Sequence, residues 1–227
     1  MRISLNEIQS RVAAITDNNE VASDIDGTEY SIRTSYINRA QHQWAEIYDW
    51  QVLYKEYKMN VSTSSGNASI VLPDDFRKLA SFPKLVYDGT NTALFPEVLP
   101  QDDGQYGESD KRINILGSPS GGYILRVLGA SLASGATVIV PYYKSPASLV
   151  SPANIADVPN ADYLVQRTIA YVWEAKGDDR YPNAKAEAEL ILKNMLEQEN
   201  TYNRASQYDR VKTVEETKYG DFRMGRD

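Results

Sequence analysis

The sequence predicts an α+β protein: a helical bundle formed by both chain ends, an inserted antiparallel β-sheet or barrel domain, and an extended C-terminal arm. Apolar residues recur with helical spacing near both ends of the chain. Between them, short β-prone segments alternate with turn residues. Beyond residue 200 the apolar pattern weakens, which is typical of a segment that either stays disordered or docks on a partner. The ranges are 1–50 and 155–199 for the bundle, 51–154 for the inserted domain and 200–227 for the arm.

The N-terminal part of the bundle contains two expected helices. The first covers residues 5–15, where Ser4 is placed to cap the helix and Glu7 completes a capping box. The second covers residues 28–50 and carries apolar side chains spaced three or four apart, which predicts one core-facing stripe. The stripe consists of Ile32, Tyr36, Ala40, Trp44 and Ile47, widened by Ile37 and Tyr48.

The middle of the chain changes to the shorter period of β-strands. Residues 74–79 are expected to form a single turn capped by Asp74 and Asp75, and residues 117–122 a hairpin turn. Strands with turn residues between them predict a small antiparallel sheet or barrel. The expected strands are residues 52–61, 67–73, 84–87, 92–95, 112–116, 122–128 and 136–143.

The chain returns to the bundle through a linker rich in Pro, Ser and Ala, and two more helices follow. The third helix is expected from about Asn160 to Gly177, which can supply a left-handed cap. The fourth begins after Pro182, a residue favoured in the first helical turn. Its apolar stripe consists of Ala184, Ala188, Ile191 and Met195.

Composition limits the classes of function. The net charge of −7 argues against a broad basic face that grips nucleic-acid phosphates. It does not argue against a protein that lines a path for DNA, because an acidic lumen would repel DNA and leave it mobile. The chain has no cysteine, which excludes a disulfide framework and a thiolate metal site. No run approaches the length of a membrane span, and no signal peptide is expected.

Catalytic candidates are few. Asp24 and Asp26 resemble the signature of haloacid-dehalogenase phosphatases, but the residues before them are polar, whereas that family needs a buried strand there. The simpler interpretation is a helix start capped by Asp26 or Thr28. His42 is the only histidine, so a zinc site is not expected. We therefore expect no enzyme activity, no cofactor and no metal.

Three further patterns have simple interpretations. The cluster of Trp44, Tyr48 and Trp50 lies beside acidic residues, which favours core packing over the stacking of nucleic-acid bases. The acidic loop at residues 100–110 lacks calcium-site spacing and is expected to be a solvated, flexible tip. A carbohydrate- or host-binding module stays open as an alternative, with Tyr87, Tyr106 and Tyr123 as its candidate residues.

Three segments carry a resemblance to a known family. They are residues 37–40 (Ile-Asn-Arg-Ala) with Trp44 and Trp50, residues 72–76 (Leu-Pro-Asp-Asp-Phe), and residues 163–165 (Tyr-Leu-Val) with a later Gly-Asp-Asp and an Ala-rich helix. In this order the chain resembles, over residues 3–199, the head–tail connector proteins of tailed bacteriophages, particularly the tail tubular protein A (adaptor) group.

The resemblance implies a structural role at the head–tail junction of a virion assembled in the host cytoplasm. Such proteins form a ring, usually of twelve copies, below the portal, join it to the tail tube or nozzle, and let DNA pass. A stopper or tail-completion protein is the alternative. By analogy the arm would dock on the portal protein through Tyr202, Tyr208, Arg210, Tyr219, Phe222 and Arg223, and Asp102, Asp103 and Tyr106 would form a tail-facing loop.

Overall fold

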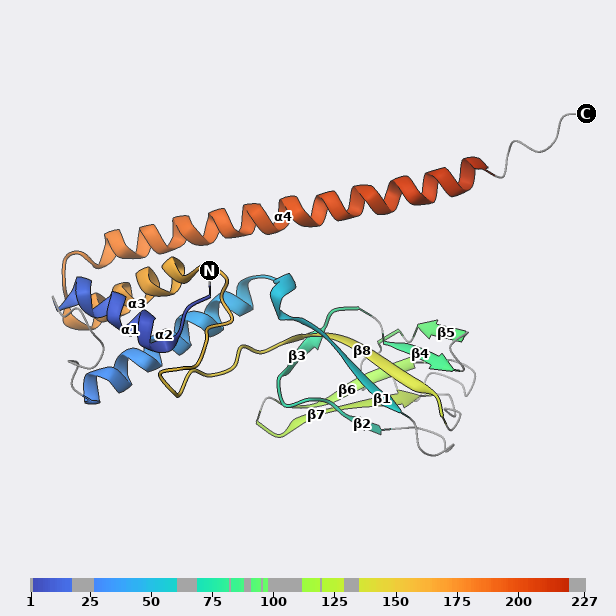
Figure 1. Ribbon diagram of the computed structural model, residues 1–227. Helices are drawn as coiled ribbons and strands as arrows, with labels where there is room; N and C mark the ends of the chain where they lie inside the picture. Colours follow the sequence, from blue (N-terminus) through green and yellow to red (C-terminus); the bar gives the residue numbers. More distant parts are fainter. Residues whose placement is uncertain are drawn as a thin grey trace, which may run out of the picture. The chain divides into compact units, whose positions relative to one another are not determined.

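The fold is that of an α+β protein, seen in a computed structural model (Figure 1). The structure describes residues 2–17, 27–60, 69–81, 83–87, 91–94, 96–97, 112–118, 120–128 and 135–220. For residues 87, 91–94 and 202–220 it describes the backbone alone.

The chain divides into two compact units. We call Met1–Gln41 with Leu149–Asp227 the helical unit, and His42–Ser148 the β unit. The chain passes from the first to the second inside helix α2. The helices are α1 (Leu5–Thr16), α2 (Gly27–Ile47), α3 (Ala161–Lys176) and α4 (Tyr181–Gly220).

The first two helices begin much as expected, but the apolar stripe of α2 differs. The Ser4 hydroxyl accepts a hydrogen bond from the Glu7 backbone N–H at 3.3 Å, which confirms the predicted cap. In α2, Ile32 and Ile47 are 48% and 50% exposed, so their placement in the core stripe was wrong. The helix also ends at Ile47 instead of residue 50. Its buried residues are Arg33, Ile37, Ala40, Gln41, Trp44 and Ala45.

Helices α3 and α4 are joined by a tight turn in the helical unit. Gly177 has φ +66° and donates its N–H to carbonyls of the last turn of α3, which confirms the predicted left-handed cap. Ala184, Ala188 and Met195 of α4 are buried. At about 1.5 Å per residue, the 40 residues of α4 extend for about 60 Å, whereas the 16 residues of α3 reach about 24 Å. Helix α4 therefore runs far past α3 (Figure 1).

The β unit contains two antiparallel sheets, and in the described residues both are open. The larger has the order β1-β8-β4-β5, with β3 also paired to β8, and the smaller has the order β2-β7-β6. The strands are β1 (Tyr54–Asn60), β2 (Ser69–Val71), β3 (Phe76–Leu79), β4 (Lys84–Tyr87), β5 (Asn91–Leu94), β6 (Arg112–Ser118), β7 (Gly122–Leu128) and β8 (Thr137–Lys144).

Strand β3 corrects the single turn expected at residues 74–79. The turn is limited to Asp74 and Asp75, and the chain then pairs with β8. The burial of Phe76 explains the difference, because its ring packs 5.2 Å from that of Tyr123 and 5.7 Å from that of Tyr142. A helical turn would not hold Phe76 and its neighbours along the edge of β8.

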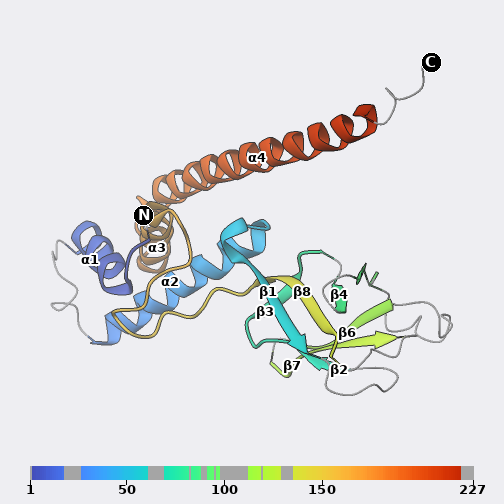
Figure 2. The same ribbon diagram turned by 45° about the vertical axis from the view of Figure 1, so that its right-hand side comes forward.

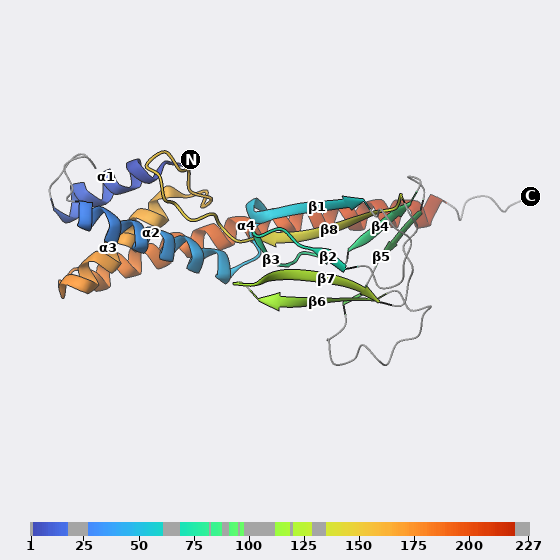
Figure 3. The same cartoon turned by 90° about the horizontal axis from the view of Figure 1, so that it is seen from below.

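The two sheets share one core. Figures 2 and 3 show β1 and β8 as one layer and β6 and β7 as the other. Burial of these apolar side chains supplies the main stabilisation of the unit. The core residues include Ile70, Ile113, Leu125 and Val127 from the smaller sheet, and Phe76, Val138, Val140 and Tyr142 from the larger.

Candidate functional site

The structure places the expected portal-docking residues only in part. Tyr202, Tyr208, Arg210 and Tyr219 belong to the backbone of α4, which continues past residue 200 as a helix to Gly220. Their side chains, and all of Phe222 and Arg223, lie outside what the structure describes. The docking role of this segment remains a prediction.

Several other predicted residues also lie outside the described residues. These are the tail-facing loop residues Asp102, Asp103 and Tyr106, and the phosphatase candidates Asp24 and Asp26. The described elements on either side of the two phosphatase candidates are the helices α1 and α2. All pairings between the named strands are antiparallel, and Glu97 and Ile113 form an isolated parallel bridge outside them, so the described residues contain no parallel sheet like that of the phosphatase family.

The aromatic cluster at the end of α2 is confirmed as core. Trp44 and Trp50 are almost fully buried, and their rings stack 4.8 Å apart. The Trp50 indole donates a hydrogen bond of 2.7 Å to the Trp44 carbonyl. Tyr48 packs edge-on against Trp50 at 5.3 Å. The two tryptophan rings therefore offer no free face on which a base could stack.

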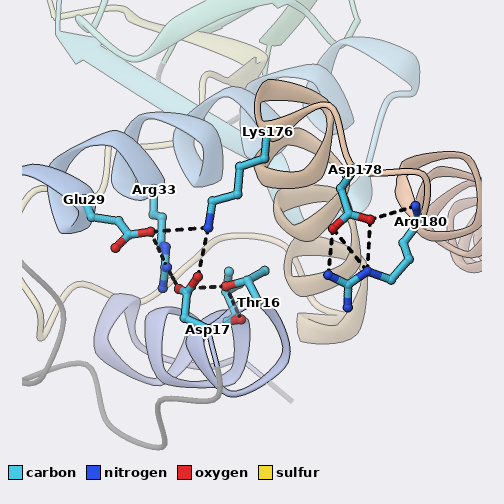
Figure 4. A network of polar contacts seen from close by, with 8 residues as sticks. Thr16, Asp17, Glu29, Arg33, Lys176, Asp178 and Arg180 are labelled. Carbon is cyan, nitrogen blue, oxygen red and sulfur yellow. Dashed lines mark hydrogen bonds and ion pairs between the residues drawn. The ribbon is translucent and has the colours of Figure 1, made fainter.

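A network of charged residues joins three helices of the helical unit (Figure 4). Arg33 of α2 is 1% exposed and contacts Glu29, one turn earlier, at 2.6 Å. The same guanidinium contacts Asp17, the C-cap residue of α1. Lys176, in the last turn of α3, lies 2.9 Å from Asp17 and 3.8 Å from Glu29. Each carboxylate is thus neutralised by two cations.

Burial lowers the pKa of the Arg33 guanidinium below its ordinary value. Even so, arginine stays protonated near neutral pH, so the network keeps its charges. A buried cation held by two carboxylates fixes the positions of α1, α2 and α3. Such a network suits a structural role and leaves neither Asp17 nor Glu29 free to act as a general base.

The turn between α3 and α4 has its own ion pair. The Arg180 guanidinium donates hydrogen bonds to both carboxylate oxygens of Asp178, at 2.6 to 3.2 Å. These bonds lower the pKa of the half-buried Asp178 carboxyl to about 2. The same guanidinium lies 4.4 Å above the ring of Trp173. The Gly-Asp-Asp segment that carried part of the resemblance therefore caps α3 and stabilises the turn into α4.

Asn38 and Gln41 of α2 form hydrogen bonds to the segment that follows the β unit, and we call these two residues the polar clamp. The Asn38 side chain donates to the Leu149 carbonyl at 3.0 Å and accepts from the Leu149 N–H at 2.7 Å. Gln41 accepts from the Asp157 N–H at 3.0 Å. The Asn38 bonds give a physical reason for the asparagine of the Ile-Asn-Arg-Ala segment.

In the β unit, the Leu-Pro-Asp-Asp-Phe segment ties strands together through Asp75. Its carboxylate accepts hydrogen bonds from Lys55 of β1 at 2.7 Å and from the Tyr142 hydroxyl of β8 at 2.8 Å. Burial acts to raise the pKa of the Asp75 carboxyl, but the bonds from Lys55 and Tyr142 outweigh it and lower that pKa. Burial and the bond to Asp75 raise the pKa of Tyr142.

The next residues of β3 hold the end of α2. Arg77 donates a 2.5 Å hydrogen bond to the Ala45 carbonyl, and Lys78 lies 2.5 Å from the Asp49 carboxylate. Cations are favourable near the last carbonyls of a helix. Neither residue was singled out from the sequence, although two adjacent cations immediately after Leu-Pro-Asp-Asp-Phe were visible there.

Each unit contains a hollow lined by described residues. The hollow of the β unit has a volume of about 440 Å³ and brings His42 near Asp74, Ser145 and Lys78. Within the described residues, His42 has no hydrogen bond to a serine or an aspartate, as a catalytic relay would need. The hollow of the helical unit, about 430 Å³, lies among α1, α3 and α4.

Neither a metal site nor a membrane-spanning helix is found among the described residues. They contain no group of three or more His, Cys, Asp or Glu side chains arranged to hold a metal ion. Of the helices among them, none combines the length and apolarity needed to cross a membrane.

The comparisons with known proteins agree with a structural site. A family model described as SU10 adaptor protein matches residues 3–214, which include nearly all of both units. A search among curated proteins gave no match.

Proposed function

Because the chain belongs to the SU10 adaptor protein family, a family of phage structural adaptors, we propose that it joins the portal to the tail at the head–tail junction of a tailed phage. Copies would form a ring below the portal, and DNA would pass through its centre. The observation that carries this proposal is the length of the match, because residues 3–214 include both units and most of α4.

The end of α4 is the segment proposed to bind the portal. The helix is about 36 Å longer than α3 can cover. An isolated helix is only marginally stable in water, so a contact along this segment would stabilise it. Aromatic and arginine side chains are enriched at the energetic centres of interfaces. The proposed anchors are Tyr202, Tyr208, Arg210, Tyr219, Phe222 and Arg223.

The β unit is proposed to face the tail. Asp102, Asp103 and Tyr106 belong to the connection between β5 and β6, and loops on a rigid scaffold commonly carry binding residues. The two-layer core and the Asp75 contacts supply such a scaffold. The net charge of −7 supports DNA passage without retention, because like charges repel.

The portal-docking proposal is tested by truncation. A chain ending at residue 199 should keep its fold, since the described core residues of α4 end at Met195. It should lose association with the portal in co-sedimentation. Substituting Tyr202 and Tyr208 with alanine in the full chain should weaken the same association. The matched control is Tyr54→Ala, which removes an exposed tyrosine of the β unit.

Two outcomes would contradict parts of the proposal. Normal portal binding by the truncated chain would remove the docking role of the arm. Binding to the tail tube in place of the portal would indicate a tail-completion protein instead. Electron microscopy of particles with labelled protein would show which neighbour it contacts.

A further inference from the structure

The larger sheet of the β unit carries a row of three side chains on its outer face. Ile139 of β8 pairs directly with Lys58 of β1 on one side and with Lys84 of β4 on the other. Side chains of residues paired in this way lie on the same face of a sheet. Their neighbours Val138 and Leu85 pack against the core, so the row faces away from it. We call Lys58, Ile139 and Lys84 the lysine row.

The lysine row combines two uncompensated cations with an apolar centre. Both lysines are exposed, and Ile139 between them is half-buried. Within the part of the chain that the structure describes, neither lysine forms an ion pair. Neighbouring strands lie about 4.8 Å apart, so the Cα atoms of Lys58 and Lys84 are separated by about 10 Å.

Edge protection explains only one of the two lysines. A lysine on an edge strand can prevent the free edge from pairing with another chain. Lys58 fits this explanation, because β1 is at the edge of the described sheet. Lys84 does not fit it, because β4 lies between β8 and β5. The pairing of both lysines with one apolar residue therefore needs another explanation.

A protein partner matches the lysine row better than DNA does. Phosphates would contact the two lysines, but Ile139 would contribute nothing, and the net charge of −7 repels a duplex. Protein interfaces instead place apolar contacts at the centre and polar contacts at the rim. The matching surface has an apolar side chain between two carboxylates.

Helix α4 carries this pattern on an exposed face. Glu187, Leu190, Asn194 and Glu197 follow each other at spacings of three, four and three residues, so they share one side of the helix. All four are exposed, Leu190 by 58%. Glu187 forms no ion pair among the described residues, and Glu197 has only an exposed contact of 4.0 Å with Lys193, which contributes little. We call these four residues the acidic face of α4.

We propose that the acidic face of α4 in one copy packs on the lysine row of a neighbouring copy, with Leu190 against Ile139 and the glutamates opposite the lysines. The two glutamates are about 15 Å apart along the helix axis. The flexible four-carbon stems of the lysines allow the ammonium groups to spread from about 10 Å and reach both.

The two surfaces differ, so each copy offers its helix to one neighbour and its sheet to the other. Such heterologous contacts generate a ring when the rotation closes. This interface rests on the proposed function, because it supplies the contact that a ring of identical copies needs. Opposite charges on the two surfaces also favour this contact over like pairs of surfaces.

Charge reversal in two separate chains tests the contact. The sheet variant carries Lys58→Glu and Lys84→Glu, and the helix variant carries Glu187→Lys and Glu197→Lys. All four positions are exposed, so both variants should fold, as circular dichroism will show. Each variant alone should self-associate about tenfold more weakly than the native chain, because like charges would face each other. Analytical ultracentrifugation with and without portal measures this.

An equal mixture of the two variants should recover the native self-association. Each copy of one variant can then lie between two copies of the other, with opposite charges in contact on both sides. A contact within one chain would not be recovered by mixing. The matched control carries Glu46→Lys and Glu97→Lys, which reverse two exposed glutamates of the β unit and change the net charge as the helix variant does. This control should self-associate like the native chain.

Three outcomes would contradict the proposal. A mixture of folded variants that stays dissociated, while the native chain assembles, would overturn this interface and leave the proposed function intact. So would a sheet variant that self-associates normally but loses binding to the tail or to duplex DNA, which would assign the lysine row to that partner. A native chain that stays monomeric even with portal would overturn both.

Discussion

At the scale of the residue, Arg33 explains the largest error in the sequence prediction of α2. An arginine on a helix normally faces solvent, and the apolar spacing predicts a stripe through Ile32 and Ile47 in its place. The guanidinium is instead buried because Asp17 and Glu29 neutralise it. The pairing with Asp17 joins two helices, and no local spacing encodes it. Only Glu29, four residues before Arg33, was a visible signal.

Asp17 should contribute more to stability than Glu29, because its side chain is 19% exposed compared with 38%. Asp17→Asn leaves the buried Arg33 poorly compensated and should lower the free energy of unfolding by about 3 kcal/mol. Glu29→Gln should cost about 1 kcal/mol or less. Urea denaturation followed by circular dichroism measures both. Equal losses of unfolding free energy for the two variants would show that the burial of a carboxylate does not determine how much it stabilises the fold.

The Asp75 carboxylate should make the free energy of unfolding depend on pH in the acid range. Its folded pKa is lowered below the ordinary 3.8. The contribution of Asp75 to the free energy of unfolding is therefore complete above its unfolded pKa. It is lost as pH falls through its folded pKa. The stability advantage of the native chain over Asp75→Asn should stay constant from neutral pH to about pH 4 and shrink below it. Urea titrations at several pH values measure this, and an advantage that grows in acid would contradict it.

At the scale of the element, the polar clamp binds α2 to a segment 111 residues away. Asn38→Ala would leave the N–H and the carbonyl of the buried Leu149 without their partner. We expect a loss of about 2 kcal/mol in the free energy of unfolding and faster hydrogen exchange at the Leu149 amide. The control is Ser35→Ala, since Ser35 bonds only within its own helix. Unchanged exchange at Leu149 would contradict the clamp.

Two glycines of the β6–β7 hairpin, Gly117 and Gly122, both have positive φ but differ in the space around them. A Cβ at Gly117 would lie 2.1 Å from the Gly122 carbonyl oxygen, whereas a Cβ at Gly122 would meet nothing within 4 Å. Gly122→Ala should cost about 1 kcal/mol through backbone strain alone. Gly117→Ala should cost more, because the strand pairing must also shift. Thermal unfolding of the two variants compares them, and equal melting temperatures would show that the close approach is unimportant.

The elements were more predictable than their contacts. Capping residues and glycines act locally, so Ser4, Asn160 and Gly177 located helix ends correctly. Strand β3 was missed because the burial of Phe76 depends on Tyr123 and Tyr142, which are distant in sequence. The polar clamp was missed for the same reason. The expected anchors of the arm and of the tail-facing loop stay predictions.

At the scale of the whole molecule, the charge balance predicts weak interaction with DNA. The chain carries a net charge of −7, and many of its cations are already paired with carboxylates. Non-specific DNA binders reach a Kd of about 10⁻⁴ to 10⁻⁶ M at physiological salt, and this protein should bind more weakly. Fluorescence anisotropy with duplex DNA measures it. A micromolar Kd that weakens steeply with salt would argue against free passage of DNA.

The polar clamp has a consequence for how this chain can change. The β unit is entered at His42 and left at Ser148, and close to both points Asn38 and Leu149 are hydrogen-bonded to each other. An inserted domain whose two ends lie at neighbouring points can be lengthened, shortened or exchanged without disrupting the unit into which it is inserted. We therefore expect the helical unit to keep its fold when another domain replaces the β unit, provided that Asn38 is kept.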